Sequence, residues 1–292
     1  MLMDNTEKSF TSNVKPIWCP GCGNYGTYAA LNKALVELGL QKENVVMVSG
    51  IGCSCSMPHT FNTYGIHSLH GRLLPVAEGV KLANDNLTVI GIGGDGDGYG
   101  IGVGHLIHVA RRNVQITYIV VDNSIYGLTT GQASPTSLMG TVTKSTPFGS
   151  IETPENPIAV ALAAGASYVA RTFSGDPVHM TEIIKSALQH KGFALIDVLS
   201  PCVSFNSTNT SDWYRQRVYK LGQDHDASDL SKAMERAWET EKSGWSKIPI
   251  GVFYKKERPT YAELDVTLKK GPLVNQPNPT KQQVLDALEE LR

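Results

Sequence analysis

The stretch "LTVIGIGGDGDGYGIG", residues 87–102, predicts the class of fold. It begins as an apolar run typical of a buried strand, continues as a glycine-rich loop and leads into residues 101–112, whose apolar spacing predicts a helix. Strand, loop and helix in this order form the repeating unit of α/β proteins. Because Gly91, Gly93 and Gly96 also satisfy G-x-G-x-x-G, dinucleotide binding is the first functional hypothesis.

Two acidic residues in this loop, Asp95 and Asp97, argue against a bare dinucleotide site, because carboxylates repel a diphosphate. A divalent cation between the two removes the repulsion. The next predicted strand, residues 115–123, ends in Asn123, and neighbouring parallel strands bring their carboxyl ends to the same edge of a sheet. Asp95 and Asn123 are therefore predicted to share one Mg²⁺, with a nearby backbone carbonyl as a further ligand. The alternative is that the acids only support turns and that Asn123 caps the next element.

The same alternation of strands and helices continues to about residue 200. Further strands are predicted at 44–50, 167–173 and 193–200, and further helices at 24–38, 74–84, 156–166 and 176–190. This pattern predicts an α/β fold in residues 1–205, with a parallel sheet covered by helices on both faces. Residues 206–292 are more polar and richer in turns, so they are expected to form a C-terminal extension or arm for packing and for contacts between subunits.

Composition and charge exclude several other classes of protein. The chain has 292 residues, 41% of them hydrophobic, and a net charge of −1, so it carries no electrostatic footprint for nucleic acid or an anionic membrane. No apolar run approaches the roughly 20 residues needed to cross a bilayer. The N-terminus lacks the layout of a signal peptide, and the expected compartment is the cytoplasm, where clustered cysteines suggest a metal centre.

The five cysteines are unevenly spaced. Cys19 and Cys22 form a C-x-x-C pair within "IWCPGCG", Cys53 and Cys55 are separated by one residue, and Cys202 stands alone. A zinc ribbon needs a second pair with two-residue spacing, so the pattern fits an iron–sulfur cluster better than zinc, which stays as the alternative.

Taken together, these motifs resemble those of the β subunit of 2-oxoacid:ferredoxin oxidoreductases. The matching stretches are "WCPGCGNYG", "GIGCS", "GIHSLHGR", "GIGGDGDGYGIG", "DNSIYGLTTGQASPT" and "SPCVSFN", which lie between residue 18 and about residue 206. The resemblance implies a thiamine diphosphate-binding fold that also carries a [4Fe–4S] cluster.

The resemblance also assigns residues to the cofactors. It implies that the cluster is bound by Cys19, Cys22, Cys53 and Cys202, which leaves Cys55 as a small buried residue. It implies that Mg²⁺ is bound by Asp95, Asn123 and the carbonyl of Ile125. The residues implied to contact thiamine diphosphate are Ile51, Gly52, Cys53, Ser54, His70, Gly94, Gly96, Asp97, Gly127 and Leu128. His70 is the candidate catalytic residue in this chain, and the catalytic Glu is expected from the partner subunit.

The implied reaction is the reversible, CoA-dependent oxidative decarboxylation of a 2-oxoacid to an acyl-CoA and CO₂, with electrons passing through the cluster to ferredoxin. The resemblance favours 2-oxoglutarate, with pyruvate and branched-chain 2-oxoacids as alternatives. It also implies an α subunit and an (αβ)₂ assembly. One departure concerns Ser56, because many relatives have a basic residue there that would suit a substrate carboxylate. The alternative from another class is a non-catalytic subunit that binds zinc and a dinucleotide.

Overall fold

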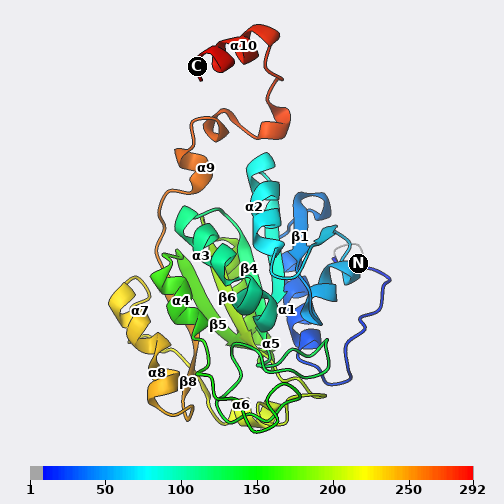
Figure 1. Ribbon diagram of the computed structural model, residues 1–292, viewed down its shortest axis with the longest axis vertical. Coiled ribbons are helices and arrows are strands. Elements are labelled where there is room, and N and C mark those ends of the chain that lie inside the picture. Colours follow the sequence, from blue (N-terminus) through cyan, green and yellow to red (C-terminus); the bar gives the residue numbers. More distant parts are fainter. Residues whose placement is uncertain (1–8, 292) are drawn as a thin grey trace, which may run out of the picture.

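An eight-stranded sheet runs through the computed structural model, which describes residues 9–291 (Figure 1). The strand order is β2-β1-β3-β4-β6-β5-β8-β7. The strands are β1 (Val45–Ser49), β2 (Tyr64–His67), β3 (Thr88–Gly94), β4 (Thr117–Asp122), β5 (Tyr168–Phe173), β6 (Ala194–Leu199), β7 (Val218–Lys220) and β8 (Ile248–Lys255). Neighbouring strands from β2 to β5 are parallel, as predicted. The difference from the prediction is β8, which pairs antiparallel with β5.

Helices cover both faces of the sheet, which confirms the predicted architecture (Figure 1). The helices are α1 (Asn24–Glu37), α2 (Leu73–Ala83), α3 (Val103–Arg112), α4 (Pro157–Ala163), α5 (Pro177–Leu188), α6 (Ser211–Arg215), α7 (Leu230–Ala237), α8 (Glu239–Lys242), α9 (Tyr261–Leu264) and α10 (Lys281–Glu289). One core cluster contains residues of α2, α3, α4 and α7, and the other contains residues of α1 and α5. No helix among residues 9–291 is long and apolar enough to cross a membrane.

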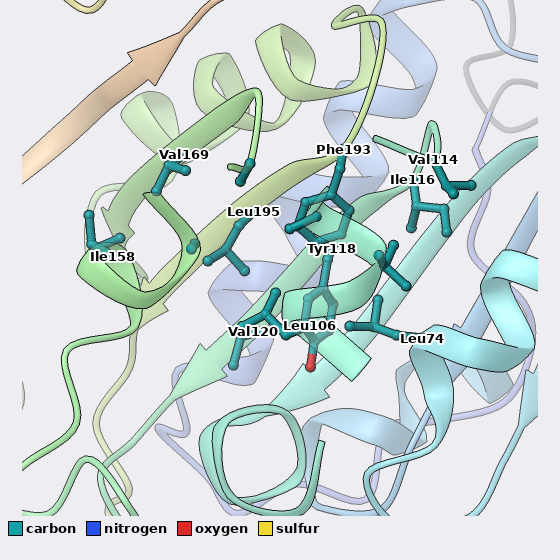
Figure 2. Packing of buried hydrophobic residues seen from close by; sticks show 14 of the residues in the cluster. Leu74, Leu106, Val114, Ile116, Tyr118, Val120, Ile158, Val169, Phe193 and Leu195 are labelled. Atoms are coloured by element: carbon teal, nitrogen blue, oxygen red, sulfur yellow. The ribbon is translucent and has the colours of Figure 1, made fainter. Parts of the chain in front are cut away.

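Successive side chains along each strand alternate between the two faces of the sheet, so the hydrophobic core is divided between these faces. In β4, Tyr118 and Val120 belong to the first cluster, whereas Ile119 belongs to the second. Successive side chains of a strand point to opposite faces, so a strand buried on both sides reads as a continuous apolar run. Figure 2 shows Tyr118 beside Phe193 in the first cluster, where both side chains are fully buried.

The loop that follows β3 contains a short π-helix rather than a simple turn. The π-helix covers Gly96–Ile101 and leads into α3, which begins two residues later than the predicted helix. Its Tyr99 hydroxyl donates to Asp197 Oδ1 at 3.0 Å, and Asp197 Oδ2 is 2.7 Å from Arg171 Nε in a buried ion pair. This network fastens the glycine loop to the centre of the sheet.

The C-terminal residues fall into two parts. Strands β7 and β8 extend the sheet, and Phe253 of β8 lies in the first core cluster. Beyond β8 the chain first stays on the body, where Arg258 donates to Ala110 O and Gly165 O and where Thr260 and Leu268 are buried. It then continues as an arm, residues 277–291, whose helix α10 has no buried residue (Figure 1). The division at residue 205 stays a prediction, with β7 and β8 of the second segment lying in the same sheet as the first.

The topology predicts where a ligand binds. From β1 the chain crosses to β2 on one side, whereas from β3 it crosses to β4 on the other. In open α/β sheets, ligands bind outside the carboxyl ends of the strands at such a reversal. A ligand is therefore expected between the loops that follow β1 and β3.

Candidate functional site

A small cavity of about 60 Å³ lies between the loops that follow β1, β3 and β4. It is lined by every residue that the sequence assigned to thiamine diphosphate and Mg²⁺: Ile51, Gly52, Cys53, Ser54, His70, Gly94, Asp95, Gly96, Asp97, Asn123, Ile125, Gly127 and Leu128. Tyr126 and Thr129, which the sequence did not single out, line it too. The fold thus brings the predicted residues together, while their individual roles stay predictions.

Asp95 is the carboxylate best suited to a cation in this cavity. It is 2% exposed, and Thr136 Oγ1 lies 2.9 Å from its Oδ2 and 2.7 Å from Asp122 Oδ1. A hydroxyl has one proton, so it cannot donate to two carboxylates. Burial, followed by the charge of Asp95, raises the pKa of Asp122 well above its usual range. Burial raises the pKa of Asp95 to about 6, and a bound cation would keep this carboxyl ionised.

Asp97 ties three loops together. Its Oδ1 accepts hydrogen bonds from Ile51 N at 2.9 Å, Gly71 N at 2.7 Å and His70 Nδ1 at 2.9 Å. The carboxylate therefore fixes the wall of the cavity, although the sequence suggested only that Asp97 lines it. The sequence of a glycine-rich loop does not show which distant loops its acidic residues will bind.

His70 is oriented by this carboxylate. Its Nδ1 is assigned the proton, because Asp97 Oδ1 already accepts hydrogen bonds from Ile51 N and Gly71 N. The Nε2 atom is the remaining polar atom of a ring that is one-third exposed and lines the cavity. A histidine held in this way can present Nε2 to a cofactor or substrate as a hydrogen-bonding or proton-transfer group.

A second cavity, of about 340 Å³, is lined by the four cysteines predicted to bind the cluster: Cys19, Cys22, Cys53 and Cys202. A Cβ placed on Gly127 would lie 3.6 Å from Cys202 Sγ and 3.7 Å from Cys53 Sγ. Burial, followed by the neighbouring thiols, raises the pKa of Cys53 to about 11, and burial is also the main cause of the raised pKa of Cys22. Cluster binding must therefore displace protons from these thiols.

The donor set fits a cluster better than a single ion. Within residues 9–291, no three His, Cys, Asp or Glu side chains converge closely enough to bind one metal ion. The ligands of a [4Fe–4S] cluster bond different iron atoms, so thiolates distributed around a cavity suit that group. Magnesium at Asp95 would depend on one carboxylate, one amide and one carbonyl.

Cys55 lies behind the wall of this cavity, whereas Ser56 lines it. Cys55 is fully buried, and burial raises the pKa of its thiol strongly. Ser56 Oγ donates to Cys53 O at 2.9 Å and lies 3.0 Å from Trp18 Nε1, which also donates to Cys53 O at 2.7 Å. Trp18 thus joins the C-x-x-C loop to the loop after β1.

The two cavities share one wall, formed by Ile51, Gly52, Cys53, Asn123, Gly127 and Leu128. A group bound in one cavity would therefore be separated from a group bound in the other by a single layer of residues.

Comparison with known proteins shows which family has sequences similar to this chain. The sequence model described as "Thiamine pyrophosphate enzyme, C-terminal TPP binding domain" matches residues 45–198. The model for the C-terminal part of the pyruvate ferredoxin oxidoreductase beta subunit matches residues 202–270.

Individual relatives agree with these models. The chain is 48% identical over 256 residues to "2-oxoacid:ferredoxin oxidoreductase subunit beta" of Sulfolobus sp, which covers 84% of each protein. It is 38% identical over 247 residues to "2-oxoglutarate synthase subunit KorB" of Methanocaldococcus jannaschii, which covers 85% of this chain and 90% of the relative. The chain belongs to the β-subunit family of 2-oxoacid:ferredoxin oxidoreductases.

A solved relative shows the same fold. The structure of 2-oxoglutarate:ferredoxin oxidoreductase from Magnetococcus marinus superposes with a TM-score of 0.90 at 40% identity and covers 98% of this chain and 96% of that one. The predicted family, fold and enzyme class of this 2-oxoacid:ferredoxin oxidoreductase β subunit are confirmed, and the non-catalytic alternative is wrong. The matched domain supports thiamine diphosphate as a cofactor.

Proposed function

We propose that this β subunit acts with an α subunit on 2-oxoglutarate. The substrate, CoA and two oxidised ferredoxins would give succinyl-CoA, CO₂, a proton and two reduced ferredoxins, and the reverse carboxylation would run through the same site. Support for this substrate comes from relatives named for it, including "2-oxoglutarate oxidoreductase subunit KorB" of Mycobacterium tuberculosis, 49% identical over 199 residues. The Magnetococcus marinus enzyme named above adds a structural relative of the same type.

The observation that carries the proposal is the wall shared by the two cavities. When bound, thiamine diphosphate supplies a nucleophilic carbon and an electron sink for cleavage next to a ketone. On one side of the wall, Asp95, Asn123 and the Ile125 carbonyl would hold Mg²⁺ against the diphosphate. On the other side, the four thiols would hold a [4Fe–4S] cluster as the one-electron acceptor. Cys53 lies in both cavities, so the electron path between them is short.

The size of the first cavity supports an obligate partner. About 60 Å³ accommodates little more than a fragment of the cofactor, whereas pockets for whole small molecules hold roughly 300–1,000 Å³. We therefore propose that the pocket is completed by the α subunit, which would supply the Glu that faces the cofactor's aminopyrimidine ring. The arm at residues 277–291 would contact that subunit in an (αβ)₂ assembly in the cytoplasm, with a ferredoxin as the external partner.

The proposal is tested by a cofactor inventory of the anaerobically purified complex. We expect iron, acid-labile sulfide, magnesium and thiamine diphosphate, together with ferredoxin reduction that depends on both 2-oxoglutarate and CoA. Pyruvate and a branched-chain 2-oxoacid serve as comparison substrates. A preference for either of them would contradict the proposed substrate, and zinc without iron or sulfide would contradict the cluster.

The metal assignment has its own test in Asp95→Ala. This change should weaken Mg²⁺-dependent binding of thiamine diphosphate by at least about 100-fold, because the cavity loses the carboxylate proposed to bind the cation. Visible absorption of the cluster should stay unchanged and serves as the control. Unaltered cofactor affinity in a calorimetric titration would exclude Asp95 as a magnesium ligand.

A further inference from the structure

The cavities lack the strong positive charge that a dicarboxylate substrate needs. Among the described residues that line them, none is a lysine or arginine. Ser56, which lines the second cavity, is neutral, and its hydroxyl contacts Cys53 O and Trp18 Nε1. A cation for the substrate must therefore come from just outside these walls or from the partner.

Lys144 is fastened to the loop that continues from the lining of the cofactor cavity. Its Nζ donates to Thr130 Oγ1 at 2.6 Å, and its backbone N–H donates to Gly131 O at 3.3 Å. The next residue, Ser145, accepts a hydrogen bond from Ala133 N at 3.0 Å. Three contacts thus dock the segment around Lys144 on the loop that continues outward from Thr129, a residue of the cavity lining.

Thr130 adopts an unusual backbone conformation that serves this contact. Its φ is +74°, in the left-handed region that residues other than glycine rarely adopt. β-Branched residues are among the least suited to it, so the surrounding contacts must hold Thr130 there. Its hydroxyl is the fixed point to which the long Lys144 side chain is attached.

The Lys144 ammonium has capacity for an anion. None of the ion pairs among residues 9–291 includes Lys144, whereas Lys33, Lys185, Lys220 and Lys232 each have a carboxylate partner. An ammonium has three donors, and Thr130 accepts one of them. The other two can bind a carboxylate that reaches this side chain.

We propose that Lys144 determines substrate specificity by binding the distal carboxylate of a dicarboxylic 2-oxoacid; this rests on the proposed function. The ketone of the substrate must lie beside the cofactor inside the cavity, so the opposite end of the molecule extends outward. Lys144 is attached to Thr130, which follows the lining residue Thr129 in the chain and does not itself line the cavity. Its charge would favour a substrate that ends in a carboxylate over one that ends in a methyl group.

The test uses the complete αβ enzyme with the variants Lys144→Gln and Lys144→Arg. The Gln variant should raise the KM for 2-oxoglutarate by about 10- to 100-fold, the effect of losing a charged hydrogen bond, and change the KM for 2-oxobutyrate by less than about 2-fold. The inhibition constant of glutarate, which has two carboxylates and no ketone, should rise by the same factor. The Arg variant should recover most of the loss, and Lys242→Gln, at an exposed lysine of α8, is the matched control.

The outcomes separate this role from the proposed function. Equal losses for both substrates, or unchanged selectivity in the Gln variant, would overturn the role of Lys144. A wild-type enzyme that does not use 2-oxoglutarate would overturn the proposed function and this inference with it.

Discussion

The structural surroundings of the five cysteine residues separate four of them from the fifth. Cys19, Cys22, Cys53 and Cys202 line one cavity, whereas Cys55 is fully buried behind its wall. Spacing could favour iron over zinc, and the resemblance selected the four ligands. Neither could show that Trp18 would donate a hydrogen bond to the Cys53 carbonyl, because this contact joins segments far apart in sequence.

Replacing the cysteines one at a time tests this distinction. Serine at position 19, 22, 53 or 202 should lower iron and sulfide content to less than about half, because each change removes one of four thiolate ligands. Cys55→Ser should retain both and lower stability by about 1–2 kcal/mol, since it buries a hydroxyl. Full iron in the Cys202 variant with loss in the Cys55 variant would contradict the ligand set.

His190 gives the chain a predictable response to acid. It is 2% exposed, and its Nε2 lies 2.8 Å from Ser167 Oγ, which donates to Asn113 Oδ1 at 2.6 Å. The Ser167 proton is therefore engaged, so His190 Nε2 carries its own proton, and Nδ1 has no partner among the described residues. Burial, followed by the charge of Lys255, lowers the pKa of His190 to about 4.

The sign of the pH dependence follows from that shift. A histidine whose folded pKa lies below its unfolded value of about 6.5 contributes stability above pH 6.5 that is lost as the pH falls toward 4. We expect the Tm of the wild type to decrease between pH 7 and pH 5 by more than that of His190→Gln. Parallel decreases in the two proteins, measured by calorimetry, would show that His190 is not the group responsible.

At the scale of elements, continuous apolar runs were enough to predict β1, β3, β4, β5 and β6. Three strands were missed, β2, β7 and β8, of which β2 and β7 have only four and three residues, and every residue of β2 is exposed. Short strands of this kind are determined by their neighbours in the sheet rather than by their own pattern. The π-helix was missed for a related reason. Its Tyr99 hydroxyl donates a hydrogen bond to Asp197 of β6, a strand far from it in the sequence.

Two glycines near the π-helix provide a matched test of this element. A Cβ on Gly96 would overlap the Tyr126 ring, whereas a Cβ on Gly104 in α3 meets no atom within 4 Å. Gly96→Ala should destabilise the protein by about 1–3 kcal/mol and weaken cofactor binding, because the ring must move. Gly104→Ala should stabilise it by about 0.5–1 kcal/mol through the higher helix propensity of alanine. Denaturant unfolding and cofactor titration measure both, and equal effects of the two changes would contradict the close approach of Tyr126.

At the scale of the whole molecule, the chain is expected to be catalytically incomplete. Its cofactor cavity is small, and its last helix has no buried residue. The purified β subunit should reduce no ferredoxin or viologen with any 2-oxoacid and CoA, even if it carries a cluster. Adding the α subunit should restore the reaction. Substantial turnover by the β subunit alone, shown to be free of partner, would refute this prediction.

Because Cys53 lines both cavities, oxygen damage to one centre should also impair the other. If Cys53 binds the cluster as predicted, oxidative loss of the cluster frees its thiolate and loosens the segment that also forms the cofactor wall. Exposure to air would then remove the carbon chemistry together with the electron chemistry. Repair with iron and sulfide would have to precede the return of thiamine diphosphate.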